Sequence, residues 1–236
     1  MSPGVTSPSL AWAICTVARS GSTWLSQLAA STNRLGYPDE YLLHWPSWRR
    51  QLGLSESLNR DAYLACLVQQ RVTPNGVFAI KGSCTELAPF FELYPNAACV
   101  WLVRENKIEQ AVSWHRAHDL GLWTHGSPPA AACDLDRALE RSLWFYDEIA
   151  RRDAQWQKFF VAHRIDPLVL TYEAVCRDPL AAVRRMATFL GIDAQTIDRV
   201  DSPLRVQRSG ESEELSGRLA AALAKRAPSL WPAAGP

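Results

Sequence analysis

The sequence lacks an excess of charge of either sign. Its 236 residues include 25 Lys and Arg against 24 Asp and Glu, which gives a net charge of +1 at pH 7. A chain without a broad positive field is poorly suited to hold DNA, RNA or an anionic membrane surface. We therefore expect no nucleic-acid partner and no membrane partner, and we expect any bound anion to be held by a few local groups.

Long apolar runs and metal-binding clusters are also missing. The run from Leu10 to Val17 has the length of a strand, and the leader before it contains no Lys or Arg, so neither a membrane span nor a signal peptide fits. The 6 Cys form no Cys-x-x-Cys pair and no Cys/His cluster with zinc spacing. Most of them have apolar neighbours, which is typical of reduced, buried thiols. We expect a cytoplasmic protein that holds no metal.

The sequence does contain an alternation of short apolar runs and helical patterns. The apolar runs at 10–17, 76–81, 97–103 and 167–172 indicate buried strands, and the helical patterns occupy 23–31, 61–72, 107–118, 136–163 and 179–190. Strands that alternate with helices predict a parallel sheet covered on both faces. The expected fold class is α/β, a P-loop-like three-layer fold with a central, mainly parallel sheet flanked by helices. We expect one domain over 10–226, between a flexible leader at 1–9 and a frayed tail at 227–236.

A segment rich in Ser and Gly lies where the first strand ends and the first helix begins, the place where ligands bind in open α/β sheets. Backbone N–H groups at the helix start and nearby hydroxyls form an anion cradle. The alternative is an ordinary Ser/Thr helix cap. The pattern GxxxxGK[ST] is absent, so a Mg-dependent phosphoryl transfer is poorly supported. The cradle residues are Arg19, Ser20, Gly21, Ser22 and Thr23.

A second group of anion-binding residues follows the third apolar run. Arg104 comes directly after that run, and Ser113 lies inside the next helix. An arginine at the carboxyl end of a strand, beside the first loop, is suited to bind a second phosphate. The alternative is an exposed arginine and an unrelated helix serine. Together with the first loop, the pair indicates a nucleotide that carries anions at its 5′ and 3′ positions.

A candidate general base lies in the turn-rich segment Gly36-Tyr-Pro-Asp-Glu-Tyr41, directly after the first helix. Such a segment can fold back over the first loop, where Glu40 could deprotonate an acceptor hydroxyl. Asp39 is the adjacent competitor for this role. The alternative for both is a pair of solvated turn carboxylates.

These motifs, in this order, resemble the bacterial trehalose 2-sulfotransferase family, a branch of the sulfotransferases that use 3′-phosphoadenosine 5′-phosphosulfate. The resemblance extends from Val17 to the region of Leu223. Its motifs are Arg-Ser-Gly-Ser-Thr at 19–23, Gly-x-Pro-x-Glu-Tyr at 36–41, Thr-Pro-Asn-Gly-Val-Phe-x-x-Lys at 73–81, Arg104, Gln-Ala-Val-Ser-x-x-Arg-Ala at 110–117, Trp123 and Gln-Arg-Ser at 207–209.

The resemblance implies a role for each of these positions. The first loop would hold the 5′-phosphosulfate, with Arg19 also stabilising the leaving phosphate, and Arg104 with Ser113 would hold the 3′-phosphate. Glu40 would be the general base in a transfer of the sulfuryl group to a hydroxyl, without a metal. Gln207 and Arg208 would close over the nucleotide, and Lys81 and Trp123 would contribute to substrate binding. The alternative for Lys81 is a simple pairing with a carboxylate. His115, at a position where the family more usually has an aromatic residue, is a further candidate for substrate binding. Members of that family often form homodimers.

Tryptophan is the residue type in excess, with 10 in the chain. Trp45 and Trp48 follow the Glu40 turn closely, and a carbohydrate or a glycosylated or small natural product binds well on such rings. The alternative is that both rings only pack a long loop. Trp114, on a helix against the sheet, is expected to be a core residue.

Two other classes of function remain open. A P-loop-like kinase or nucleotide hydrolase would require Mg²⁺ and a lysine in the first loop. A non-catalytic nucleotide-binding or structural protein would require that Glu40 points away from the donor.

Overall fold

Four strands form one parallel sheet in the computed structural model, which describes residues 7–123, 134–202 and 210–226. The strands are β1 (Leu10–Thr16), β2 (Val77–Gly82), β3 (Ala98–Val103) and β4 (Leu168–Thr171). Their order is β2-β1-β3-β4, so β1 lies between β2 and β3. Each strand begins and ends within one residue of the apolar run that predicted it. The expected α/β class with a parallel sheet is confirmed.

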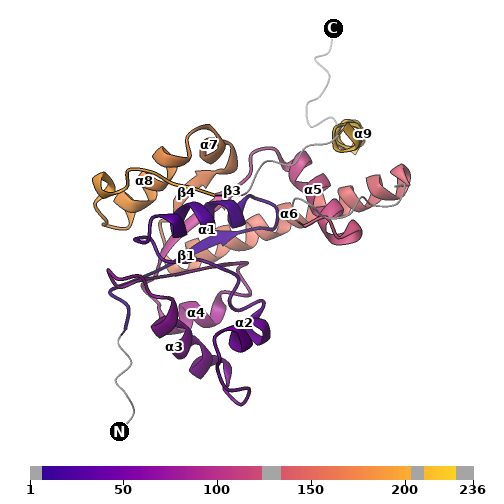
Figure 1. The fold of residues 1–236 in the computed structure, drawn as a ribbon. Coiled ribbons are helices and arrows are strands. Elements are labelled where there is room, and N and C mark those ends of the chain that lie inside the picture. The colour runs from indigo at the N-terminus through magenta and orange to yellow at the C-terminus, as the bar shows by residue number, and fades with distance from the viewer. Residues whose placement is uncertain (1–6, 124–133, 203–209, 227–236) are drawn as a thin grey trace. The chain divides into compact units, whose positions relative to one another are not determined.

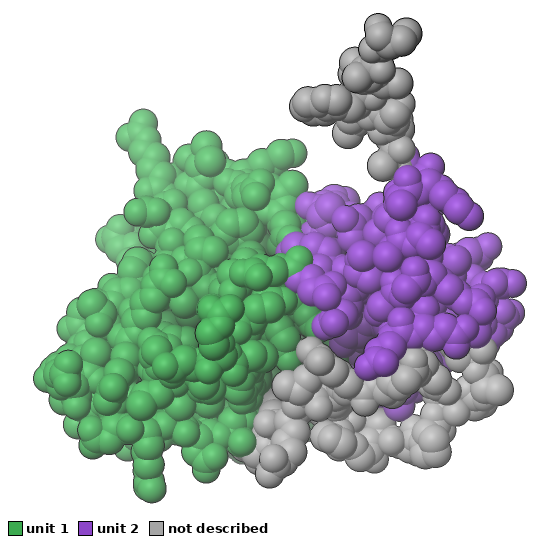
Figure 2. Space-filling model, turned by 90° about the horizontal axis from the view of Figure 1, so that it is seen from above, with its two compact units in different colours: residues 1–105, 152–203 green, residues 106–151, 204–236 purple. Residues whose placement is uncertain are grey.

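The chain divides into two compact units (Figure 2). One comprises Met1–Glu105 with Arg152–Pro203, and the other comprises Asn106–Arg151 with Leu204–Pro236. The long helix α6 (Leu135–His163) begins in the second unit and ends in the first. All four strands, the first loop and the Glu40 turn therefore belong to the first unit.

Helices cover both faces of the sheet in the first unit (Figure 1). On one face, α1 (Ser22–Ser31), α7 (Tyr172–Arg177) and α8 (Pro179–Phe189) share a buried cluster with strand residues that include Trp12, Ile14, Ala79, Val100 and Leu170. On the other face, Phe78 lies 6.2 Å from Phe90 of α4 (Ala88–Leu93), measured between ring centroids. There too, Trp101 lies 5.5 Å from Phe160 of α6. Because successive strand residues point to opposite faces, strands with few polar residues need this double cover.

The longer helices begin where polar side chains can cap them. Asn59, Asn106 and Asp178 accept hydrogen bonds from backbone N–H groups in the first turns of α3 (Arg60–Arg71), α5 (Lys107–Leu120) and α8. Such caps satisfy donors that a helix start leaves without an intrahelical partner. The predicted start of α8 at Pro179 is confirmed.

Four of the described α-helices were not predicted from the sequence: the short helices α2 (Trp45–Gln51), α4 and α7, and the 17-residue helix α9 (Gly210–Arg226). Tyr172, expected to end the fourth strand, instead begins α7, because the Thr171 side chain caps that helix by accepting a bond from the Ala174 N–H. The strand is shorter by one residue as a result.

The second unit is built around α5, the first part of α6 and α9 (Gly210–Arg226), of which α5 and α9 pack together. Trp114 of α5 is buried and stacks on Phe145 of α6, with ring centroids 5.1 Å apart. The prediction that Trp114 is a core residue is confirmed.

The cysteines in the described part of the chain are unpaired. Burial raises the pKa of the Cys15 thiol, so this sulfur stays protonated and behaves as an apolar side chain. Cys133 lies outside the described residues. The unpaired residues are Cys15, Cys66, Cys84, Cys99 and Cys176.

Candidate active site

The segment between β1 and α1 forms a tightly constrained loop. Arg19 has a φ of 64° and Gly21 a φ of 88°, both in the left-handed region. A Cβ on Gly21 would lie 2.4 Å from Cδ2 of Tyr172, so no larger residue fits without a shift. Ser20 is fully buried, and its hydroxyl hydrogen-bonds to that of Thr16 at the end of β1. The loop conformation is therefore fixed by its surroundings.

Helix α1 begins without a side-chain cap. Within the ranges that the structure describes, no side chain accepts a hydrogen bond from its first turn. The bond from the Leu25 N–H to the Gly21 carbonyl, at 3.1 Å, is the first to continue the helix. The preceding N–H groups point out of the helix start, together with the positive end of the helix dipole. Helices α3, α5 and α8 do have side-chain caps, whereas the short helices α2 and α4, like α1, do not. The start of α1 is a place for an anion because it also lies beyond the carboxyl end of β1.

Arg104 meets this loop from the neighbouring strand. It follows β3 directly, and its Nη1 donates a hydrogen bond to the Arg19 carbonyl at 3.5 Å. Its guanidinium carbon lies 4.8 Å from the centroid of the Tyr172 ring. Tyr172 also covers Gly21, and sequence reasoning missed this tyrosine. Its position directly after β4, the strand beside β3, is the signal that could have found it.

The Glu40 carboxylate lies beside the start of α1. Nζ of Lys81 donates a hydrogen bond to Thr23 Oγ1 at 2.9 Å and lies 3.6 Å from Glu40 Oε1. The other carboxylate oxygen, Oε2, lies 3.5 Å from Nε2 of His44, a residue that the sequence analysis did not select. Oδ1 of Asp39 instead accepts a hydrogen bond from the backbone N–H of Glu40 at 2.7 Å. Of the two competing carboxylates, that of Glu40 is the one joined to the α1 start through Lys81.

The Glu40 turn is fixed along the edge of β2. The backbone N–H of Lys81 donates to the Asp39 carbonyl at 3.1 Å. Gly36 has a φ of 84°, and a Cβ there would lie 2.5 Å from the Cβ of Ala79. Because Gly36 has no side chain, the chain passes β2 at close range, which brings Glu40 to Lys81.

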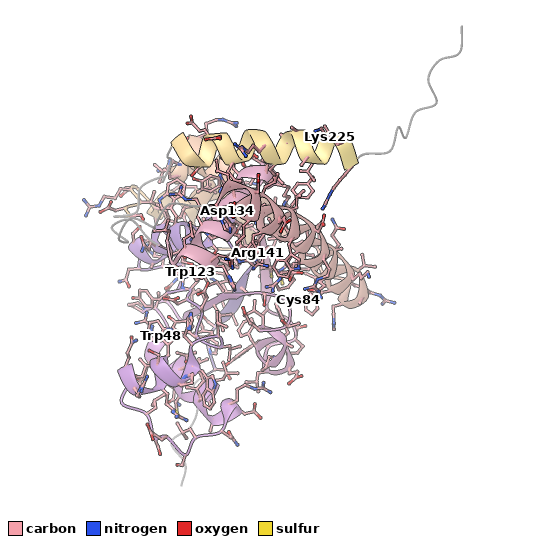
Figure 3. All side chains as sticks on the ribbon, turned by 90° about the vertical axis from the view of Figure 1, so that its right-hand side faces the viewer. Trp48, Cys84, Trp123, Asp134, Arg141 and Lys225 are labelled. Atoms are coloured by element: carbon pink, nitrogen blue, oxygen red, sulfur yellow. The ribbon has the colours of Figure 1, made fainter. Side chains whose placement is uncertain are left out.

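Trp45 and Trp48 lie in α2, where both are half-buried; Figure 3 labels Trp48. The Trp48 ring meets that of Tyr41 edge-on at 4.8 Å, and the Arg71 guanidinium lies 5.4 Å from its centroid. The Trp45 ring lies 5.9 Å from that of Tyr63. These contacts favour the packing interpretation for part of each ring and leave the rest accessible.

Three other candidates, Ser113, His115 and Trp123, belong to the second unit. Ser113 lies in α5, His115 is buried with Nδ1 2.9 Å from Asp119 Oδ2, and Trp123 is half exposed. Gln207 and Arg208 lie outside the described residues, so their roles remain predictions. The first unit thus brings together Arg19–Thr23, Arg104, Lys81 and Glu40.

Two negative findings apply to the described ranges 7–123, 134–202 and 210–226. No group of three or more His, Cys, Asp or Glu side chains there could hold a metal ion. No helix in these ranges is both long and apolar enough to cross a membrane.

Comparison with known proteins adds a family and a shared fold. The family model described as Stf0 sulphotransferase matches residues 82–221. A crystal structure of a sulfotransferase from Alicyclobacillus acidocaldarius has a TM-score of 0.50 and 17% identity, over 91% of this chain and 92% of that chain. This likeness confirms the P-loop-like three-layer fold expected from the sequence.

Two further solved structures are those of retinol dehydratase. The complex with androsterone and the inactive cofactor PAP has a TM-score of 0.46 and 17% identity, over 94% of this chain and 82% of that chain. The complex with retinol and PAP has a TM-score of 0.45 and 16% identity, over 96% of this chain and 84% of that chain. No curated protein sequence matches the chain.

Proposed function

The chain belongs to the Stf0 sulphotransferase family, and on this premise we propose that it transfers a sulfuryl group from 3′-phosphoadenosine 5′-phosphosulfate to a hydroxyl group of a small acceptor. Membership makes the protein a sulfotransferase; the donor, the acceptor and the roles of single residues are the proposal. The family match begins at Gly82, so the first loop and Glu40 precede it. Their roles are argued from geometry.

One observation carries the proposal: the uncapped start of α1 lies between charged side chains at the ends of β2 and β3, the two strands that flank β1. Arg104, after β3, contacts the loop on one side, and Lys81, near the end of β2, contacts Thr23 on the other. Glu40 lies next to Lys81. Anion-binding donors and a carboxylate therefore meet at one place, as a transfer from an anionic donor to a hydroxyl requires.

The loop is suited to the phosphosulfate end of the donor. Backbone N–H groups at the start of α1 and the Arg19 cation would bind the 5′-phosphate and stabilise the charge it gains as the leaving group. Gly21 has no side chain, so the ligand can approach the backbone at this point. A Cβ there would also meet Tyr172. Arg104 would bind the 3′-phosphate together with Ser113, a bidentate contact that lysine could not reproduce.

Glu40 is proposed as the general base. It would take the proton of the acceptor hydroxyl while the acceptor oxygen forms a bond to sulfur and the bond from sulfur to the phosphate oxygen breaks. The released product would be adenosine 3′,5′-bisphosphate. Proton transfer of this kind typically contributes about 10²- to 10⁴-fold to the rate.

The acceptor is proposed to be a carbohydrate, or a glycosylated or small natural product. The half-buried rings of Trp45 and Trp48 follow directly on the Glu40 turn and present apolar faces with polar groups around them. Trp123 and His115 are further candidates for binding the acceptor. We also propose one catalytic domain over 10–226, a cytoplasmic location, consistent with the unpaired cysteines, and a homodimer.

Ligand binding tests the donor assignment. In thermal unfolding, adenosine 3′,5′-bisphosphate at 100 times its Kd should stabilise the folded state by about 2.7 kcal/mol. ATP with Mg²⁺ should give a smaller shift. Stabilisation by ATP with Mg²⁺ alone would support a kinase or hydrolase and contradict the donor assignment.

Transfer of labelled sulfate to a panel of glycosides and alcohols then tests the activity itself. Labelled product from at least one glycoside is expected. Binding of adenosine 3′,5′-bisphosphate without transfer to any member of a broad panel would instead indicate a nucleotide-binding protein.

A further inference from the structure

Lys81 occupies a position where a charged residue is unexpected. It follows Val77 and Ala79 along the face of β2 that packs with α1, because residues two apart point to the same side of a strand. In the pairing of β2 with its neighbour β1, Lys81 lies opposite Ile14. The alternation therefore directs the lysine side chain under the start of α1, where 2% of it remains exposed.

Burial makes this ammonium costly to keep. A buried cation is destabilising unless its N–H groups are well paired, and an apolar residue of similar volume is often neutral or stabilising in its place. Lys81 makes a good hydrogen bond to Thr23, but its 3.6 Å distance to Glu40 Oε1 is longer than the roughly 2.7–2.9 Å of a charge-assisted hydrogen bond. Stability alone does not account for a lysine here.

We propose that Lys81 is the positioning residue that aligns Glu40 with the bound donor. This inference rests on the proposed function. Thr23 lies in the first turn of α1, where the phosphosulfate would bind, and Lys81 joins it to the base. The ammonium holds Oε1 on the side of Thr23, so that Oε2 takes the proton when the acceptor oxygen bonds to sulfur and the bond from sulfur to the phosphate oxygen breaks.

Other charged groups also face this carboxylate. His44, at the start of α2, lies 3.5 Å from Oε2, and Asp39 precedes Glu40 and accepts its backbone N–H. His44 can therefore help to position the Glu40 carboxylate as well. A test of Lys81 needs a matched change at His44.

The first experiment replaces the cation. Lys81→Met keeps the length of the side chain and removes its charge, and Lys81→Gln removes the charge but retains a donor for Thr23. Both variants should lower kcat by about 10- to 100-fold, the cost of a displaced catalytic group, while adenosine 3′,5′-bisphosphate binding is retained.

A double-mutant cycle separates action through Glu40 from other roles. If Lys81 acts through the base, Glu40→Gln and the double variant with Lys81→Met should have the same residual turnover. A further loss in the double variant would show that Lys81 acts on the donor directly or supports the fold, which overturns the inference. His44→Gln is the matched control: it removes the other partner of Glu40 and should leave the effect of Lys81→Met unchanged.

Failure of the inference and failure of the proposed function give different results. If Glu40→Gln is inactive while Lys81→Met and Lys81→Gln keep wild-type kcat, Lys81 has no positioning role and the base assignment stands. If Glu40→Gln keeps full turnover, the base assignment itself is wrong, and with it the premise of this inference.

Discussion

Two carboxylates in this protein have cationic neighbours at different distances. Asp119 of α5, in the second unit, accepts a hydrogen bond from Arg141 Nε at 2.8 Å, and the Nδ1 atoms of His115 and His118 lie 2.9 and 2.6 Å from its oxygens. These partners hold the pKa of Asp119 well below its ordinary value. Glu40, in the first unit, has Nε2 of His44 at 3.5 Å and Nζ of Lys81 at 3.6 Å from its oxygens.

The difference distinguishes a carboxylate used for structure from one suited to chemistry. The donors around Asp119 occupy both of its oxygens at hydrogen-bond distance, and such a group is a poor proton acceptor. Glu40 is held in place by longer contacts, so its oxygens retain capacity for a proton or a substrate hydroxyl. The arginine-paired Asp119 is thus suited to a structural role, and the surroundings of Glu40 beside the start of α1 agree with its proposed role as the base.

Replacing the loosely held carboxylate should have the largest effect. Glu40→Gln keeps the shape of the side chain and removes the base, so we expect turnover to fall by about 10²- to 10⁴-fold. Binding of adenosine 3′,5′-bisphosphate, measured by calorimetry, should be retained because the proposed role of Glu40 is toward the acceptor. Asp39→Asn is the matched control and should lose much less activity; the opposite ranking of the two variants would reverse the assignment.

A change at Arg104 extends the comparison from the two carboxylates to two arginines, one in each unit. Arg141 is paired with Asp119, whereas Arg104 contacts the Arg19 carbonyl and the Tyr172 ring. Arg104→Ala should weaken binding of adenosine 3′,5′-bisphosphate by about 2–3 kcal/mol, as expected for a charge-assisted hydrogen bond.

The nucleotide without the 3′-phosphate provides the control for Arg104. Its binding should change little in the variant, since the contact that is lost would be to the missing phosphate. Equal losses for both nucleotides in calorimetry would show that Arg104 shapes the loop instead of binding the 3′-phosphate.

The elements of the fold could be predicted closely where the sequence pattern is strong. The four apolar runs matched the strands, and Asp178 with Pro179 marked the start of α8. The seven-residue helix α2 was missed, because a helix this short has little periodicity, although Pro46 in its first turn is a start signal. Short helices depend on tertiary packing, here on the contacts of Trp45 and Trp48 with the tyrosines beneath them.

The site could be predicted residue by residue but not as an arrangement. Arg19–Thr23, Arg104 and Glu40 were selected from local signals at strand ends and turns. The contact of Lys81 with Thr23 and Glu40 depends on which strand lies next to β1 and on its register, and the segment that carries Glu40 runs along the edge of β2. Local patterns do not determine these pairings. The period of two along β2 could still have placed Lys81 on the α1 face.

The smallest effect is expected at the tightly paired carboxylate. Asp119→Asn removes the charge that Arg141, His115 and His118 surround, and should destabilise the protein by about 1 kcal/mol, a value reduced for partial exposure to solvent. Because the pKa of Asp119 is lowered in the folded state, its contribution is present above the pKa of the unfolded chain and is lost as the pH falls through the folded value. The difference from wild type should therefore narrow below about pH 4.

Chemical denaturation at several pH values measures this, and Glu214→Gln on α9 is the matched control. Glu214 pairs with Arg218 one helical turn away, with 54% and 42% of the two side chains exposed, so its loss should have a smaller effect with little pH dependence. A destabilisation of Asp119→Asn that does not change with pH would mean that the carboxylate charge contributes nothing. Asp119 and Glu40 would then differ in the distances to their partners, but the short distances around Asp119 would not add to the free energy of unfolding.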